Sequence, residues 1–198
     1  PKIYYRNILI PSNKIKVYLD FSSIIKSEVK IKKVNLSLDQ ISVNQLKILS
    51  KSFKPSNLQS FVKNKLIEGR IDSEIEFYLD KGITLNNFIA RGQVSDLKIG
   101  ISKDLELKKT SFSFFADRTD ILLKNFFGKT ELFSIKEGAL KADLTSEIKI
   151  ESNFLSNINS NEEIKKLQKL LPHLSFIKNL SNVKAELNNS LILNFDKT

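Results

Sequence analysis

Apolar residues recur at every second position over much of this chain. In the segment from Ile71 to Asp80, positions 71, 75, 77 and 79 are apolar, and most positions between them are acidic. This alternation is typical of a β-strand with one apolar and one polar face. The rhythm continues with slips of phase to residue 156, interrupted by short turns rich in Gly, Asp and Lys. We therefore expect an antiparallel meander of six or seven strands over residues 70–156.

Details of the pattern predict where these strands bend and end. The phase of the alternation slips at Ser95-Asp96, which predicts a β-bulge there. The dipeptides Gly128-Lys129 and Glu137-Gly138 follow apolar runs and predict turns. Strict alternation from Lys14 to Phe21 predicts another strand close to the start of the chain.

Helical periodicity replaces this alternation in three places. Apolar residues at 43, 46 and 49 predict a short helix, and those at 58, 61, 62 and 66 predict a second helix that ends at Gly69. Ser160 and Glu163 have the spacing of a capping box, which predicts the start of a third helix ended by Pro172. Alternation then returns from residue 182 to 195 as a final strand.

These elements predict a mainly β protein of the α+β class. We expect a long antiparallel meander that forms a strongly curved, groove-like sheet, partly covered by a helical hairpin and one further helix. Because the chain starts at Pro1 and contains no Met, we interpret residues 1–198 as a single segment of a larger protein. The expected parts are strands in 1–40, the helical hairpin in 41–69, the meander in 70–156, and a helix plus the final strand in 157–198.

The net charge of +10 bears on the choice of partner. Nearly all the positive charge is Lys, and Arg occurs only at positions 6, 70, 91 and 118. Recognition of bases favours Arg and interleaved aromatic residues, and the chain has no such cluster. We therefore expect no nucleic-acid partner. Two explanations of the positive charge stay open. One is a general bias of the composition towards Lys, Ile, Asn and Phe, and the other is attraction to an anionic membrane surface.

The residues that carry most enzyme chemistry are sparse. Without Cys the chain has no thiolate or disulfide, and the single His173 provides neither a metal cluster nor a triad. The acidic residues Asp72, Glu74 and Glu76 read as the wet face of a strand. Nucleotide-binding and hydrolase motifs are absent. We expect no enzyme, no catalytic residue, no cofactor and no metal.

One stretch of the sequence resembles a known family. The residues Phe88, Ala90, Gly92, Val94, Asp96, Leu97 and Ile99 form a phrase of the type F-x-A-x-G-x-V-x-D-L-x-I. This phrase, followed by long alternating segments, resembles the AsmA-like family of Gram-negative bacteria, which includes the YhdP and TamB groups, and is closest in pattern to the YhdP branch. The resemblance is one of rhythm and covers most of the chain.

The resemblance implies a function in the cell envelope. The parent protein would be periplasmic and anchored to the inner membrane by an N-terminal helix outside this segment, and its β-groove would conduct phospholipids between the inner and outer membranes. No apolar run within the segment approaches the roughly 20 residues that span a bilayer. The implied partners are phospholipid acyl chains, with envelope proteins as further possible partners.

The alternation fits this role independently of the family. Exposing a 16-carbon acyl chain to water costs about 12 kcal/mol, and a continuous apolar groove removes that cost. The alternative is a structural or protein-interaction domain whose apolar faces form an ordinary dry core. The residues predicted to line a lipid-binding groove are Ile71, Ile75, Phe77, Leu79, Phe112, Phe114, Ile121, Leu123, Phe133, Ile135, Ile148 and Ile150.

Overall fold

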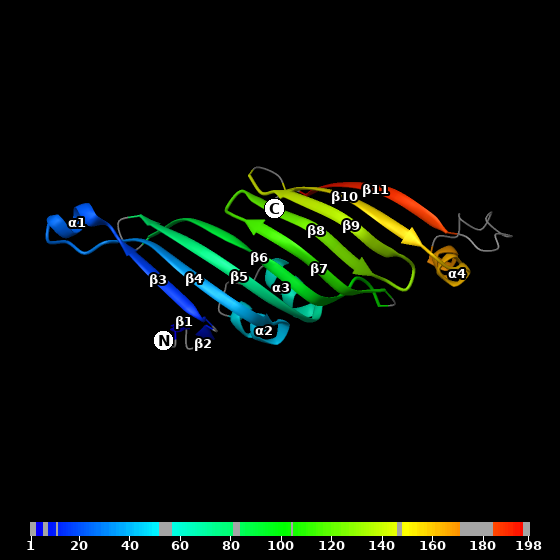
Figure 1. Ribbon diagram of the computed structural model, residues 1–198, viewed down its shortest axis with the longest axis horizontal. Helices are drawn as coiled ribbons and strands as arrows, with labels where there is room; N and C mark the ends of the chain where they lie inside the picture. The colour runs from blue at the N-terminus through cyan, green and yellow to red at the C-terminus, as the bar shows by residue number, and fades with distance from the viewer. Residues whose placement is uncertain are drawn as a thin grey trace.

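A single open antiparallel sheet of nine strands dominates the computed structural model (Figure 1). Each strand lies next to its neighbour in sequence, in the order β11-β10-β9-β8-β7-β6-β5-β4-β3. The strands are β3 (Lys14–Leu19), β4 (Ile31–Ser42), β5 (Leu66–Asp80), β6 (Thr84–Gly100), β7 (Glu106–Ala116), β8 (Asp120–Lys129), β9 (Ser134–Asp143), β10 (Ile148–Ile158) and β11 (Ala185–Phe195). The structure describes residues 3–5, 8–10, 12–51, 57–80, 84–103, 105–145, 148–170 and 184–195.

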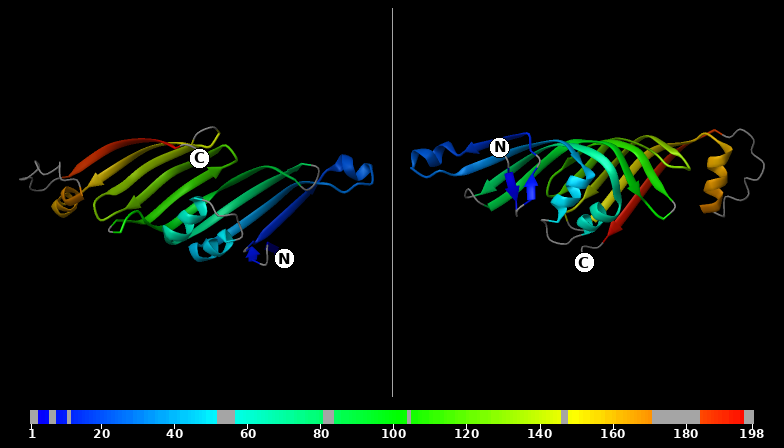
Figure 2. Two further views of the ribbon diagram at one scale, coloured as in Figure 1. Left: turned by 180° about the vertical axis from the view of Figure 1, so that it is seen from behind. Right: turned by 90° about the horizontal axis from the view of Figure 1, so that it is seen from below.

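The remaining elements are short. The strands β1 (Ile3–Tyr5) and β2 (Ile8–Ile10) form a separate hairpin, which the alternation did not predict. The helix α1 (Phe21–Ile25) lies between β3 and β4, and α4 (Asn161–Leu170) follows β10. The helices α2 (Val43–Ser50) and α3 (Asn57–Asn64) pack against each other and against β5, on one side of the sheet (Figure 2).

The predicted meander is confirmed, together with its bulge. Six strands, β5 to β10, follow one another with antiparallel pairing between residues 66 and 158. The register between β6 and β7 shifts between Val94 and Leu97, and Asp96 has a φ of 52°. An extra residue in one strand produces this shift, which explains why the alternation slips at Ser95-Asp96.

One predicted turn is displaced and the other is wrong. Gly128 and Lys129 are the last two residues of β8, and the turn follows them at residues 130–133, whereas Gly138 lies in the middle of β9. A Cβ atom on Gly138 would lie 3.1 Å from the Cβ of Phe154 and 3.3 Å from that of Phe126. Glycine is therefore used here for close approach of neighbouring side chains. The turn between β8 and β9 is formed instead by Thr130, whose hydroxyl accepts hydrogen bonds from the N–H groups of the residues two and three positions later.

Two predicted boundaries are also wrong. The strand expected over Lys14–Phe21 ends at Leu19, because the carboxylate of Asp20 accepts a hydrogen bond from the Ser22 N–H and starts α1. The helix expected to end at Gly69 ends at Asn64, and Gly69 lies inside β5 with a φ of 142°. The apolar residue at position 66 therefore belongs to a strand, although its spacing fits the preceding helix.

The third predicted helix begins where its cap predicts. The Ser160 hydroxyl accepts a hydrogen bond from the Glu163 N–H at 3.2 Å, and the Glu163 carboxylate accepts one from the Asn159 N–H at 2.7 Å. The helix boundary predicted at Pro172, and His173 after it, lie outside the described residues.

Candidate functional site: the apolar face of the sheet

The strand register gathers the predicted lipid-binding residues on one face of the sheet. Ile71 pairs with Val94, which pairs with Phe112, and residues directly opposite each other point to the same face. Continued across all strands, this register assigns eleven predicted residues to what we call the apolar face: Ile71, Ile75, Phe77, Leu79, Phe112, Phe114, Ile121, Leu123, Ile135, Ile148 and Ile150. The twelfth, Phe133, lies in the β8–β9 turn and lines a cleft on this face.

Helices α2 and α3 cover one part of the apolar face. Val43 of α2 and Val62 of α3 are buried against Leu66, Val94 and Leu97 of the sheet. Three predicted site residues also pack against this cluster, namely Ile71, Phe112 and Phe114. For these three the ordinary-core reading accounts for at least part of their burial.

Over β8 to β11, the described chain has no helix packed on the apolar face to the same extent as α2 and α3 on β4 and β5. All twelve predicted residues remain partly accessible to water. On the same face of the edge strand β11, Leu187, Leu191 and Leu193 are exposed. The apolar face therefore extends well beyond the area that the helical hairpin covers.

The total accessible surface area also indicates that much of the sheet is uncovered. The chain exposes 13841 Å² to solvent, whereas a compact protein of 22.6 kDa exposes about 9,500 Å². The excess is roughly 4,300 Å² for the chain as a whole, and a single sheet with little covering on either side contributes to it. This is far from the burial expected of a closed two-layer domain.

A cleft of about 260 Å³ opens on the apolar face between β7 and β10. Its lining residues are Ile101, Leu107, Phe126, Thr130, Phe133, Ile135, Gly138, Ala139, Leu140, Ser152 and Phe154. The floor includes the ring of Phe126, which stacks on Phe112 with 5.6 Å between ring centroids and 12° between ring planes.

The sequence pattern missed part of this cleft. Leu107, Phe126, Leu140 and Phe154 were not among the predicted residues, although all four line it. Asn125 has a φ of 52°, and this break in β8 turns Phe126 toward the apolar face while Phe127 is 45% exposed. Two adjacent Phe residues give no signal in the alternation that would decide between them.

The opposite face of the sheet carries ion pairs over β4 to β6, and over β7 to β11 it also carries the apolar residues Phe115, Leu122 and Ile192. The Lys33 ammonium lies 3.1 Å from the Glu76 carboxylate, which also accepts a hydrogen bond of 2.7 Å from the Tyr78 hydroxyl. The hydroxyl of Tyr78 and then the ammonium of Lys33 lower the pKa of Glu76. Arg91 pairs with Glu74 at 2.9 Å. The predicted wet face is thus a set of cross-strand pairs, and no metal-binding group of three or more His, Cys, Asp or Glu residues occurs in the described part of the chain.

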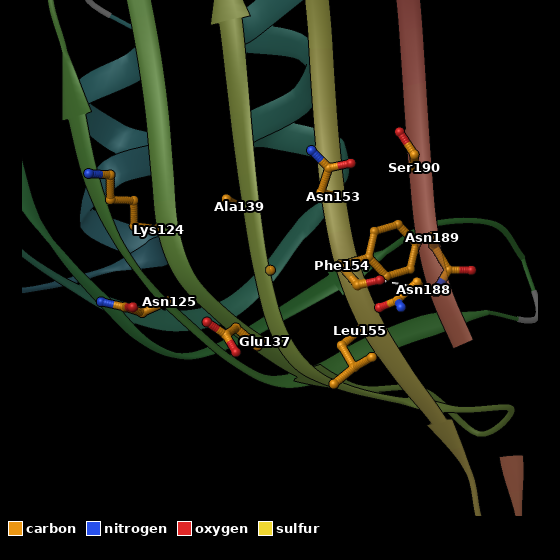
Figure 3. A pocket seen from close by; sticks show the side chains of 11 residues that line it. Lys124, Asn125, Glu137, Ala139, Asn153, Phe154, Leu155, Asn188, Asn189 and Ser190 are labelled. Atoms are coloured by element: carbon orange, nitrogen blue, oxygen red, sulfur yellow. Dashed lines mark hydrogen bonds between the residues drawn. The ribbon is translucent and has the colours of Figure 1, made fainter. Parts of the chain in front are cut away.

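A shallow hollow of about 650 Å³ crosses β8 to β11 (Figure 3). Register places Lys124, Glu137, Asn153 and Ser190 on the polar face. At its base Asn189 donates hydrogen bonds to the carbonyl of Phe154 at 3.2 Å and to the hydroxyl of Ser156 at 2.9 Å. The residues lining the hollow include no His or Cys that could form a nucleophile–base pair.

Comparison with known proteins assigns no family. No family model, no curated protein and no solved structure matches this chain. Among the described helices, none combines the length and apolar character that a membrane crossing requires. The function is therefore argued from the apolar face itself.

Proposed function

We propose that this chain is a non-catalytic, lipid-binding segment of an AsmA-like envelope protein. In this proposal the apolar face is the wall of a groove that holds phospholipid acyl chains and conducts them between the inner and outer membranes. The parent protein is periplasmic and anchored to the inner membrane. The observation that carries the proposal is the continuous apolar face, of which α2 and α3 cover only one part.

The dimensions of the cleft support an acyl chain as its occupant. A methylene group takes up about the room of a water molecule, roughly 30 Å³ in the liquid, so a cleft of about 260 Å³ holds eight or nine carbons. Withdrawing eight methylenes from water contributes roughly 6 kcal/mol. The remainder of a long chain would lie along the neighbouring apolar residues. Leu123 pairs with Leu140, which lines the cleft, and Ile150 lies two residues before the lining residue Ser152 on the same strand.

A second candidate is a structural or protein-interaction domain of the envelope. The outer edges of β3 and β11 have no partner strand among the described residues, and unpaired edges recruit strands from other chains. This candidate predicts an apolar face that binds no lipid. The exposed side chains of Leu187, Leu191 and Leu193 on the apolar face favour the lipid-binding candidate, since edge pairing alone would leave them in water.

The experiment compares two leucines of the same strand on opposite faces. Leu123 lies on the apolar face and pairs with Leu140, while Leu122 pairs with Lys141 on the polar face, and both are half-buried. We would prepare Leu123→Asp and Leu122→Asp and measure binding of a phosphatidylethanolamine with a fluorescent acyl chain. Native mass spectrometry with solvent extraction would show whether phospholipid copurifies with each variant.

The expected result is binding by the wild type and by Leu122→Asp, and a loss of at least tenfold in affinity for Leu123→Asp, because a carboxylate is strongly disfavoured against an acyl chain. Circular dichroism and urea unfolding would establish that both variants are folded. Equal binding by the two variants, or a folded wild type that takes up no phospholipid, would remove the groove proposal and leave the interaction domain.

A further inference from the structure

Four large apolar side chains are exposed to solvent at the tip of the β3–β4 hairpin. We call residues 20–32 the hairpin tip. Within it Phe21 is 75% exposed, Ile25 73%, Val29 74% and Ile24 45%. The exposed fractions of Phe21, Ile25 and Val29 are larger than that of any other large apolar side chain in the described part of the chain. Such a concentration within ten residues is unusual for a surface that faces only water.

The position of the tip separates it from the sheet. Figures 1 and 2 show α1 at one end of the long axis of the molecule, beyond the ends of the neighbouring strands. It is distinct from the cleft between β7 and β10, and its residues contribute nothing to that cleft. A proposal about the tip is therefore independent of the acyl-chain groove.

Polar contacts hold the tip in one conformation. The Ser23 side chain, only 4% exposed, donates a hydrogen bond of 2.7 Å to the Asp20 carbonyl and accepts one of 3.1 Å from the Lys30 N–H. The Glu28 N–H donates to the Ser23 carbonyl at 2.9 Å, which ties the far side of the loop to α1. The exposed side chains are thus presented on an ordered backbone, so binding through them orders little additional chain.

Three lysines belong to the same hairpin tip as the apolar group. Lys26, Lys30 and Lys32 are all exposed. Lys30 pairs with Glu28 at 2.6 Å, and Lys26 and Lys32 have no ion-pair partner in the part of the chain that the structure describes. With Asp20 and Glu28 counted against the three lysines, the hairpin tip has a net charge of +1, within a chain of net charge +10.

From this combination we infer that the hairpin tip inserts into the surface of an anionic lipid bilayer. Phe and Ile side chains enter the boundary between headgroups and acyl chains, and Lys26 and Lys32 contact anionic headgroups above it. A bilayer suits this tip better than a protein does. A projecting apolar group needs a matching hydrophobic pocket on a protein, whereas a fluid bilayer accommodates any such shape, and its anionic headgroups complement the lysines.

The first experiment is co-sedimentation of the whole chain with vesicles. Vesicles rich in phosphatidylglycerol supply anionic headgroups, and pure phosphatidylcholine vesicles lack net charge. Phe21→Ser with Ile25→Ser is expected to weaken binding to the anionic vesicles at least tenfold. Lys26→Gln with Lys32→Gln is expected to weaken it about thirtyfold and to leave the weak binding to phosphatidylcholine unchanged.

Matched controls make equal changes elsewhere. Ile48→Ser with Ile192→Ser removes two exposed apolar side chains from α2 and β11. Lys165→Gln with Lys169→Gln removes two exposed charges from α4 at the other end of the molecule (Figure 1). Both control proteins are expected to bind vesicles as the wild type does. A loss of binding in these controls equal to that of the tip variants would overturn the proposal, because it would make the attraction non-local.

A spectroscopic measurement tests insertion directly. The chain contains no Trp, so Phe21→Trp places a single indole at the tip, where its emission shifts to shorter wavelength on entering the bilayer interface. The same substitution at Ile192 is expected to give no shift with vesicles. Unchanged emission from Trp at position 21 would contradict insertion. A shift that follows protein concentration without vesicles would mean that a second copy covers the tip, and would equally refute the proposal.

Discussion

The close approach of side chains around Gly138 leads to a quantitative prediction. A Cβ on Gly138 would lie 3.1 Å from the Cβ of Phe154 and 3.3 Å from that of Phe126, and both rings line the apolar cleft. A Cβ on Gly100 would have no neighbour nearer than 3.8 Å. Gly138→Ala and Gly100→Ala therefore make the same chemical change in a tight and in an open place.

The difference between these two variants isolates the packing strain. Each substitution lowers the conformational entropy of the unfolded chain and so stabilises the protein by about 0.4–1 kcal/mol where the native site accepts a methyl group. This gain is common to both variants and cancels between them. Overpacking around Gly138 costs about 1–3 kcal/mol. We therefore expect Gly138→Ala to be less stable than Gly100→Ala by that amount.

Urea unfolding followed by circular dichroism measures this difference, and thermal unfolding checks it. For a chain of this size, 1 kcal/mol shifts Tm by about 2–4 °C. We also expect Gly138→Ala to weaken binding of the fluorescent phosphatidylethanolamine, since displaced Phe126 and Phe154 rings narrow the cleft. Equal stability of the two variants would refute the packing argument, because the strain would then have been relieved by movement of the rings.

Two further predictions concern buried and paired polar groups. Thr110 is fully buried and its hydroxyl has no hydrogen-bond partner within the described chain, so Thr110→Val is expected to be neutral or to stabilise by about 1 kcal/mol. Thr130→Val, which removes a hydroxyl that makes three hydrogen bonds, should destabilise by about 1–3 kcal/mol in the same urea experiment; the reverse order would contradict both assignments. The pKa of Glu76 is lowered in the folded state by Tyr78 and Lys33, so its stabilising contribution is complete above the unfolded-state pKa and is lost as pH falls through the folded-state value. Unfolding followed from neutral pH downward should therefore depend less on pH in Glu76→Gln than in the wild type, and an unchanged acid limb would show that these pairs contribute nothing.

The local pattern of the sequence determined most of the strands and their faces. Alternation is a property of neighbouring residues, since successive side chains of an extended backbone point to opposite sides. The assignment of Ile75, Phe77, Ile148 and Ile150 to one face required only that rule, and the register of the sheet agrees with it. The cap at Ser160 was predictable for the same reason, because its partners lie within four residues.

The role of a glycine was predicted wrongly where contacts between separate strands require it. Gly138 was assigned to a turn from its local composition, whereas its absent side chain makes room for Phe126 and Phe154 of the two adjacent strands. Those residues are 12 and 16 positions away in the sequence. No local pattern contains that information, because it depends on the register of three strands.

Only the tertiary structure decided which part of the apolar face is covered. Ile71 and Ile75 occupy equivalent positions in the alternation, yet Ile71 packs against the cluster formed under α2 and α3. The sequence alone also left open whether Phe126 or Phe127 faces the cleft, which the break at Asn125 settles. Periodicity fixes the direction of a side chain from its own strand, whereas the packing of helices and the placement of bulges depend on contacts between segments far apart in the chain.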